Sequence, residues 1–121
     1  MDPQQAFTVF VQKALLPEKG ERFAALSTSK NGQRRILEGL CHQFESAIRP
    51  AAIRKDGYDR LWASPCYVFQ QPLGFGAEFA SVREAYDQLS AEDSWLILLR
   101  DGSSGIYRPE GGWDDEKLIS G

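Results

Sequence analysis

The sequence has little cysteine and little histidine. Its 121 residues contain two cysteines, Cys41 and Cys66, and one histidine, His42. Two cysteines do not make a disulfide framework, and we interpret both as reduced, half-buried thiols. A structural zinc site needs about four nitrogen, sulfur or oxygen ligands, and this set is too small to supply them. We therefore expect no metal and no cofactor.

Long hydrophobic runs are also missing. The longest apolar run covers residues 95–99, far short of the ~20 residues that a transmembrane helix needs. Residues 1–5 contain no basic segment leading into an apolar stretch, as an export signal would. These absences predict a cytoplasmic protein that does not act in a membrane.

The common nucleotide and hydrolase motifs are incomplete. Gly74-Phe75-Gly76 lacks the third glycine of the dinucleotide pattern, and no Gly-Lys-Ser/Thr or Gly-x-Ser-x-Gly is present. His42 lies on the expected solvent face of a helix, where its neighbour Cys41 points about 100° away. We therefore favour a non-enzymatic role. A small enzyme or ligand binder that uses His42 and Cys66 is kept as an alternative.

The composition is that of a globular domain. Hydrophobic residues make up 42% of the chain and charged residues 26%, and the length is that of one domain. We expect a single domain over residues 1–121. Charge is uneven, because residues 1–60 hold ten Lys/Arg and seven Asp/Glu, whereas residues 61–121 hold four and ten. The second half thus has a net charge of −6, which suits a basic partner.

Helical periodicity dominates the first fifty residues. Residues 2–5 carry the capping signals of a helix start, and an apolar stripe follows until Pro17. A short second helix is expected within 18–26. A third is expected over 33–49, where Pro50 ends it.

The second half changes to strand patterns. Residues 65–69 are β-branched and aromatic, which predicts a strand after a turn at 56–57 and one or two helical turns. Residues 95–99 are apolar on both faces, as in a central strand. A turn at 101–105 then predicts a hairpin with a strand at 106–108.

The remaining segments complete the predicted fold. We expect a loop over 70–76 and a helix over 82–89, with Ser81 and Glu84 at its start. Residues 113–119 fit a last helical turn or an edge strand. Helices followed by β-α-β-β predict an α+β fold, with N-terminal helices packed on a small, mainly antiparallel sheet.

Two groups of residues are candidates for binding. Arg34 and Arg35, at the start of the helix expected over 33–49, form a basic face that suits phosphate groups. This face makes nucleic-acid binding an alternative function. The net charge of −3 argues against it, and we do not favour nucleic acid as the partner.

The second group lies near the C-terminus. Trp113 and Phe75 are aromatic residues in expected loops, where they can anchor a partner protein. Asp114 and Asp115 follow Trp113, and we interpret these acids as favourable charge at a helix start, since their spacing fits no calcium loop.

These observations favour a small protein-interaction module over an enzyme. We expect a bacterial partner protein, such as an immunity or inhibitor protein that neutralises a toxin. The oligomeric state is left open. The candidate binding residues are Arg34, Arg35, His42, Trp113, Asp114 and Asp115.

Overall fold

The computed structural model describes residues 1–40, 43–89, 93–109 and 116–120. The helices are α1 (Pro3–Ala14), α2 (Pro17–Leu26), α3 (Lys30–Glu38), α4 (Gln43–Ala47) and α5 (Val82–Gln88), with short 3-10 turns η1 (Pro50–Ala52) and η2 (Tyr58–Arg60). The strands are β1 (Ile53–Arg54), β2 (Cys66–Gln70), β3 (Gly74–Phe79), β4 (Trp95–Leu99), β5 (Ser104–Arg108) and β6 (Lys117–Ser120).

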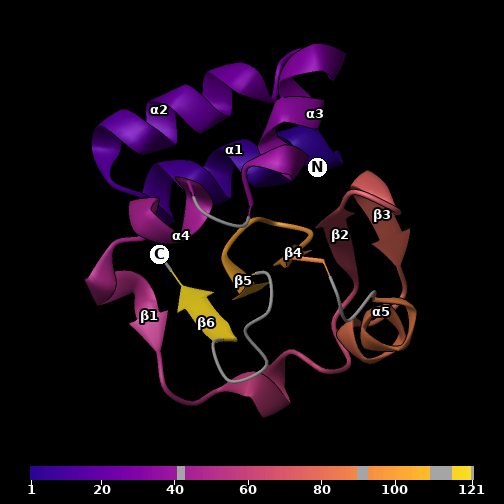
Figure 1. Ribbon diagram of the computed structural model, residues 1–121. Helices are drawn as coiled ribbons and strands as arrows, with labels where there is room; N and C mark the ends of the chain where they lie inside the picture. The colour runs from indigo at the N-terminus through magenta and orange to yellow at the C-terminus, as the bar shows by residue number, and fades with distance from the viewer. Residues whose placement is uncertain (41–42, 90–92, 110–115, 121) are drawn as a thin grey trace.

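The strands form one antiparallel sheet in the order β1-β6-β5-β4-β2-β3. Helices α1 to α4 form a layer on one side of this sheet, and α5 lies at its other side (Figure 1). This arrangement confirms the expected α+β class and the packing of N-terminal helices on an antiparallel sheet. Each helix in the described ranges is too short or too polar to cross a bilayer.

The expected β-α-β-β order misses part of the sheet. The loop expected over 70–76 is wrong, because β3 begins at Gly74 and pairs with β2 as a hairpin. Strand β1 was not predicted at all. The segment 113–119 was expected to be a helical turn or an edge strand, but β6 is an interior strand between β1 and β5. Residues 113–115 of that segment lie outside the described residues.

The first helix follows its sequence signals closely. The Asp2 side chain accepts a hydrogen bond from the Gln5 backbone N–H at 2.8 Å, and the Asp2 backbone N–H donates to the Gln5 side-chain Oε1 at 3.0 Å. The predicted apolar stripe is buried against the sheet. Its members are Phe7, Phe10, Val11, Ala14 and Leu15.

The second helix contains a glycine for a packing reason. Gly20 weakens a helix taken alone, but it lies where α2 meets α1. A Cβ at this position would stand 2.6 Å from the carbonyl oxygen of Val11. The absence of a side chain therefore allows the two helices to pack closely.

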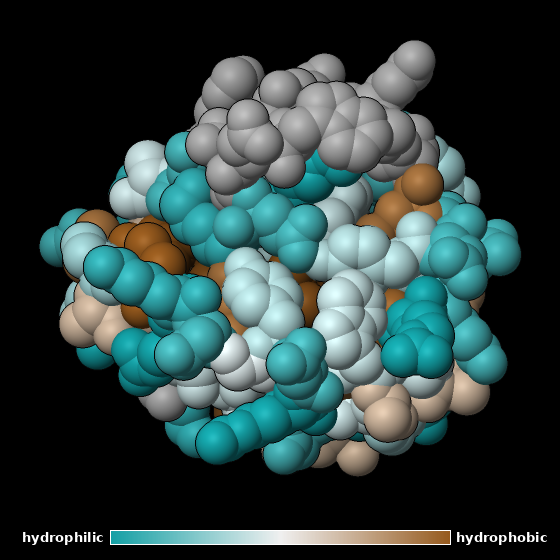
Figure 2. All heavy atoms as spheres, turned by 90° about the horizontal axis from the view of Figure 1, so that it is seen from below, coloured by the Kyte–Doolittle hydropathy of each residue, from teal (hydrophilic) through white to brown (hydrophobic). Residues whose placement is uncertain are grey.

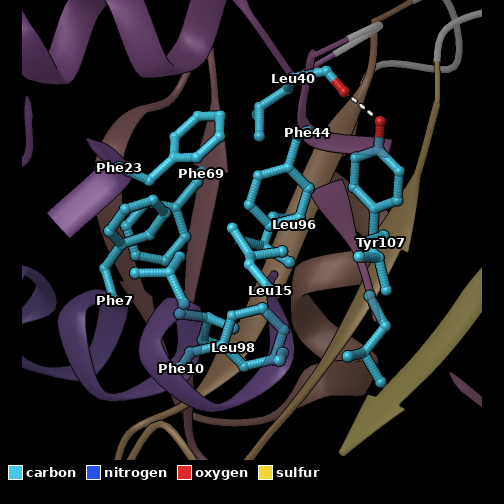
Figure 3. Packing of buried hydrophobic residues seen from close by; sticks show 14 of the residues in the cluster. Phe7, Phe10, Leu15, Phe23, Leu40, Phe44, Phe69, Leu96, Leu98 and Tyr107 are labelled. Atoms are coloured by element: carbon cyan, nitrogen blue, oxygen red, sulfur yellow. Dashed lines mark hydrogen bonds between the residues drawn. The ribbon is translucent and has the colours of Figure 1, made fainter. Parts of the chain in front are cut away.

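The single helix expected over 33–49 is wrong, because α3 already ends at Glu38. Gly39 caps α3, and α4 begins only at Gln43. At the break, the Leu40 carbonyl accepts a hydrogen bond from the buried hydroxyl of Tyr107 on β5 (Figure 3). A backbone group freed by the end of the helix is thus satisfied from the sheet.

The sheet separates two apolar clusters. The larger one joins α1 to α4 with the upper face of the sheet, and its aromatic rings interdigitate with leucines of β4 (Figure 3). The smaller one lies on the opposite face, between the sheet, η2 and α5. Strand β4 contributes to both clusters, so the prediction of a central strand apolar on both faces is confirmed.

Tight contact between α2 and α3 leads to a stability prediction. A Cβ on Gly32 would stand 1.9 Å from the Leu26 carbonyl oxygen, so Gly32→Ala must push the two helices apart. We expect a loss of about 1–3 kcal/mol in the free energy of unfolding, measured by urea denaturation. Gly39→Ala is the matched control, since its Cβ would lie 3.3 Å from its nearest neighbours. Equal stability of Gly32→Ala and the natural protein would contradict the packing argument.

Candidate functional site

The second face of the sheet changes character from one side to the other. Val68, Ile97, Ile106 and Leu118 lie opposite one another on four successive strands and form an apolar row. The row ends at Arg54, which pairs with Leu118 on the short edge strand β1. The next pair of this face, Ser104 and Ser120, brings two hydroxyls to 3.3 Å. This end of the face is therefore polar.

A cluster of three aromatic rings in tilted and edge-to-face contact covers the apolar end of the face. The ring of Tyr86 on α5 lies 4.9 Å from that of Trp62 and 5.4 Å from that of Trp95. Two backbone hydrogen bonds fix α5 to the turn after η2, from Val82 to Ser64 and from Arg83 to Trp62, at 3.0 and 3.1 Å. The cover is small, because α5 has only seven residues.

Glu116 ties this cover to the start of β6. The Tyr86 hydroxyl donates to the Glu116 carboxylate, and the Tyr58 hydroxyl lies 3.5 Å from the Glu116 backbone oxygen. Burial, the hydrogen bond to Glu116 and its charge raise the pKa of Tyr86. Burial and the Glu116 charge likewise raise the pKa of Tyr58. Both phenols therefore stay protonated at neutral pH.

Two hollows flank η2 where the cover ends. The sheet hollow, of about 530 Å³, lies between η2 and the polar end of the sheet. The α5 hollow, of about 550 Å³, lies between η2 and the start of α5. Asp59 lines both. We call the surface made by residues 54–63 with Ser81 and Arg83 the η2 face.

The sheet hollow has a charged rim and a partly apolar floor. Its lining residues are Arg54, Asp56, Gly57, Asp59, Arg60, Leu61, Ser104, Leu118 and Ser120. The α5 hollow is lined by Asp59, Trp62, Ala63, Ser81 and Arg83. Seen from below, this side of the molecule is mostly hydrophilic, with residues of intermediate hydropathy at its centre and hydrophobic atoms in the recesses between them (Figure 2).

Several charges of the η2 face have no partner among the residues that the structure describes. Arg54 donates to the Ala51 carbonyl at 2.6 Å. The side chains of Asp56, Asp59 and Arg60 are exposed and make no hydrogen bond or ion pair with the described residues. These groups are available to an external partner.

The structure separates the two arginines that the sequence singled out. Both are exposed on α3. Arg34 donates to the Asn31 side chain at 2.7 Å, whereas Arg35 lines a third hollow together with Arg22 of α2. Nucleic-acid contact through this helix stays a prediction. The other candidate residues, His42, Trp113, Asp114 and Asp115, lie outside the described residues, as does Cys41.

Cys66 lies in a poor environment for a nucleophile. Its side chain is 0% exposed in β2, and burial raises the pKa of its thiol to about 11. At neutral pH it is therefore a protonated core residue, which does not favour the alternative of an enzyme that uses Cys66. No group of three or more His, Cys, Asp or Glu in the described ranges is placed to hold a metal ion.

Phe75 is not a loop anchor. It lies half-buried on β3, with its ring 5.3 Å from Phe7 and 4.7 Å from Phe69. The prediction that Phe75 sits in a loop is therefore wrong, because β3 turns this side chain towards the core under α1.

Sequence reasoning missed the η2 face as a site. The Asp56-Gly57 turn and the helical spacing of Tyr58, Leu61 and Trp62 correctly indicated a short turn of helix. The five charged residues of both signs within 54–60 were the available signal of a candidate polar surface.

Comparison with protein-family models, with curated proteins and with solved structures gives no match for this chain. The fold and the η2 face define an α+β domain with an open, mixed-charge surface.

Burial of Cys66 predicts slow alkylation. In a Cys41→Ser variant at pH 7.5, iodoacetamide should modify native Cys66 at least about 100-fold more slowly than the urea-unfolded chain. Burial raises the pKa of the thiol from 9.0 to about 11, which leaves about 100-fold less reactive thiolate at this pH. The surrounding core also blocks the reagent from reaching the sulfur, which slows the reaction further. Mass spectrometry measures the rate, and rapid modification of the native protein would contradict the buried placement.

The raised pKa of Tyr86 predicts a loss of stability at high pH. The unfolded chain releases this proton near pH 10, while the folded protein retains it. Unfolding then releases a proton, so the free energy of unfolding falls as the pH rises above about 10. The Tyr86→Phe variant lacks the phenol and should show a shallower fall in urea denaturation between pH 9 and 11. Identical slopes for the two proteins would refute the assignment.

Proposed function

We propose that this protein is a small non-enzymatic interaction module that binds a protein partner through the η2 face. One observation carries the proposal. The half-buried rings of Tyr58 and Trp62 lie beside Asp59 and Arg60, whose charges have no partner in the described chain. An aromatic and charged surface of this kind is available for contact without any rearrangement of the fold.

The composition of the face favours a protein over a small ligand. Binding hot spots are enriched in tryptophan, tyrosine and arginine, and the η2 face contains all three. Pockets for small molecules are mostly apolar and bury most of their ligand. The sheet hollow instead is open and has arginine, aspartate and serine around an apolar floor.

Charge indicates the kind of partner surface. The η2 face presents both signs, since it contains Arg54, Lys55, Arg60 and Arg83 together with Asp56 and Asp59. Mixed charge favours a partner that carries complementary charges of both signs, and it suppresses binding to surfaces of one sign.

A bacterial immunity or inhibitor role is the finer form of this proposal. The small size of the chain supports it. The acidic residues behind the net charge of −6 in residues 61–121 lie outside the η2 face, so they suit long-range attraction of a basic target such as a nuclease toxin rather than direct contact with it. We place this role in the cytoplasm, since the free thiol of Cys66 suits a reducing compartment.

The test begins with capture of the tagged protein from a lysate of its native host, with and without nuclease. The dissociation constant of the identified protein partner is then measured for the natural chain and for Arg60→Glu. We expect at least a tenfold loss in Arg60→Glu, because the change removes the contact of Arg60 and places a like charge against the acidic partner group that would pair with it.

Arg34→Glu is the control, since it makes the same charge change on α3, at the opposite side of the sheet (Figure 1). Its dissociation constant should stay close to that of the natural protein. Full affinity in Arg60→Glu, or an equal loss in both variants, would refute binding through the η2 face.

A further inference from the structure

A third hollow lies in the helical layer, away from the η2 face. It has a volume of about 170 Å³ and opens between α2, α3 and the start of α4. Its lining residues are Arg22, Phe23, Leu26, Arg35, Glu38, Gly39 and Gln43. Two helices that are separate in sequence thus contribute one arginine each to the same small space.

The two arginines have no partner in the described part of the chain. Arg22 and Arg35 are exposed, and neither side chain makes a hydrogen bond or ion pair with the described residues. Glu38, the acid in the lining, already has an interaction of its own. The side-chain amide of Gln43 adds a further donor without a partner in the described chain. The lining therefore offers three donor groups and an excess of positive charge.

Packing of α2 against α3 fixes the backbone positions from which these two arginines project. Gly32 allows α3 to contact the end of α2, and the Gln33 side chain donates to the Ser27 carbonyl at 2.9 Å. Phe23, which is 3% exposed, closes the apolar side of the hollow. Apolar walls strengthen electrostatic attraction within such a site, because they exclude water from one side.

We propose that this hollow binds a phosphate monoester group. Guanidinium groups donate paired hydrogen bonds in a planar fork that matches phosphate oxygens, and two of them suit a dianion. The volume equals that of about five or six water molecules, which admits one phosphate group but not a whole nucleotide. Polynucleotides would need an extended basic surface instead, whereas Glu18 and Glu21 interrupt the positive charge of α2.

The test titrates the full chain with O-phosphoserine and with inorganic phosphate at constant ionic strength. Nitrogen-15 NMR of the arginine Nε–H groups should show saturable shifts at Arg22 and Arg35. Arg22→Gln and Arg35→Gln should each weaken binding at least about tenfold, since each removes a charge-assisted pair of hydrogen bonds.

Arg34→Gln is the matched control, because Arg34 is an exposed arginine of α3 that lies outside the hollow and bonds to Asn31. It should leave the affinity within about twofold. Shifts in the natural protein provide a readout that does not depend on the folding of any variant. The proposal is overturned if the shifts do not saturate, or if Arg34→Gln loses as much affinity as the other two variants.

Two further probes identify the source of the phosphate group. A phosphoserine peptide that binds more tightly than free O-phosphoserine would support a phosphorylated protein as the ligand, and equal affinities would support a small phosphorylated molecule. An oligonucleotide that binds more tightly than either, with affinity falling steeply as salt rises, would overturn the monoester proposal in favour of nucleic-acid binding through α3.

Discussion

The structure depends on one constraint, which is that strand β4 is apolar on both faces. Such a strand must be covered on both sides, since exposure of either apolar face to water costs free energy. The N-terminal helices supply the first cover with a continuous layer over the sheet. The second cover comes from α5, η2 and the aromatic cluster of Tyr86, Trp62 and Trp95. Because this second cover is small, it protects β2, β4 and part of β5 but leaves the polar end of the sheet open. The sheet hollow is a direct consequence.

The helical layer carries a second surface for a similar reason. Close helix packing here relies on glycine, at Gly20 between α1 and α2 and at Gly32 between α2 and α3. Helices that approach so closely bring the bases of their long side chains together at the seam. Arg22 and Arg35 reach the same hollow because α2 and α3 meet at a short connection with little freedom. The two surfaces lie on opposite sides of the sheet, so a partner at one does not block access to the other.

Local signals in the sequence were sufficient for much of the fold. The first helix was predictable from the cap at Asp2, and β4 from its run of apolar residues, because both signals lie within the element itself. The break at 39–40 was not predictable, since the apolar period continues through it and the hydroxyl that satisfies Leu40 comes from β5. Strand β3 was missed because it begins with two glycines, Gly74 and Gly76, and glycine-rich segments are typical of loops. Both glycines have positive φ even though they lie in the strand. The sequence singled out Arg35 of the proposed phosphate site but not Arg22. The two arginines line the same hollow only because α2 and α3 pack against each other in the folded protein.

The charges of the η2 face contribute little to the stability of the fold. Exposed ion pairs are worth about 0–1 kcal/mol at most, and Asp56, Asp59 and Arg60 make none with the described residues. The aromatic rings beside these charges do contribute to stability. Trp62 packs on Tyr86, and the Tyr86 hydroxyl donates a hydrogen bond to Glu116, which links α5 to the residue before β6. The face therefore combines packed aromatic rings with charges that the fold does not require. Side chains already held by packing lose less entropy on binding, while the charges set orientation and specificity. This division supports recognition of a partner surface, since a catalytic site would need its charged groups positioned by neighbouring side chains.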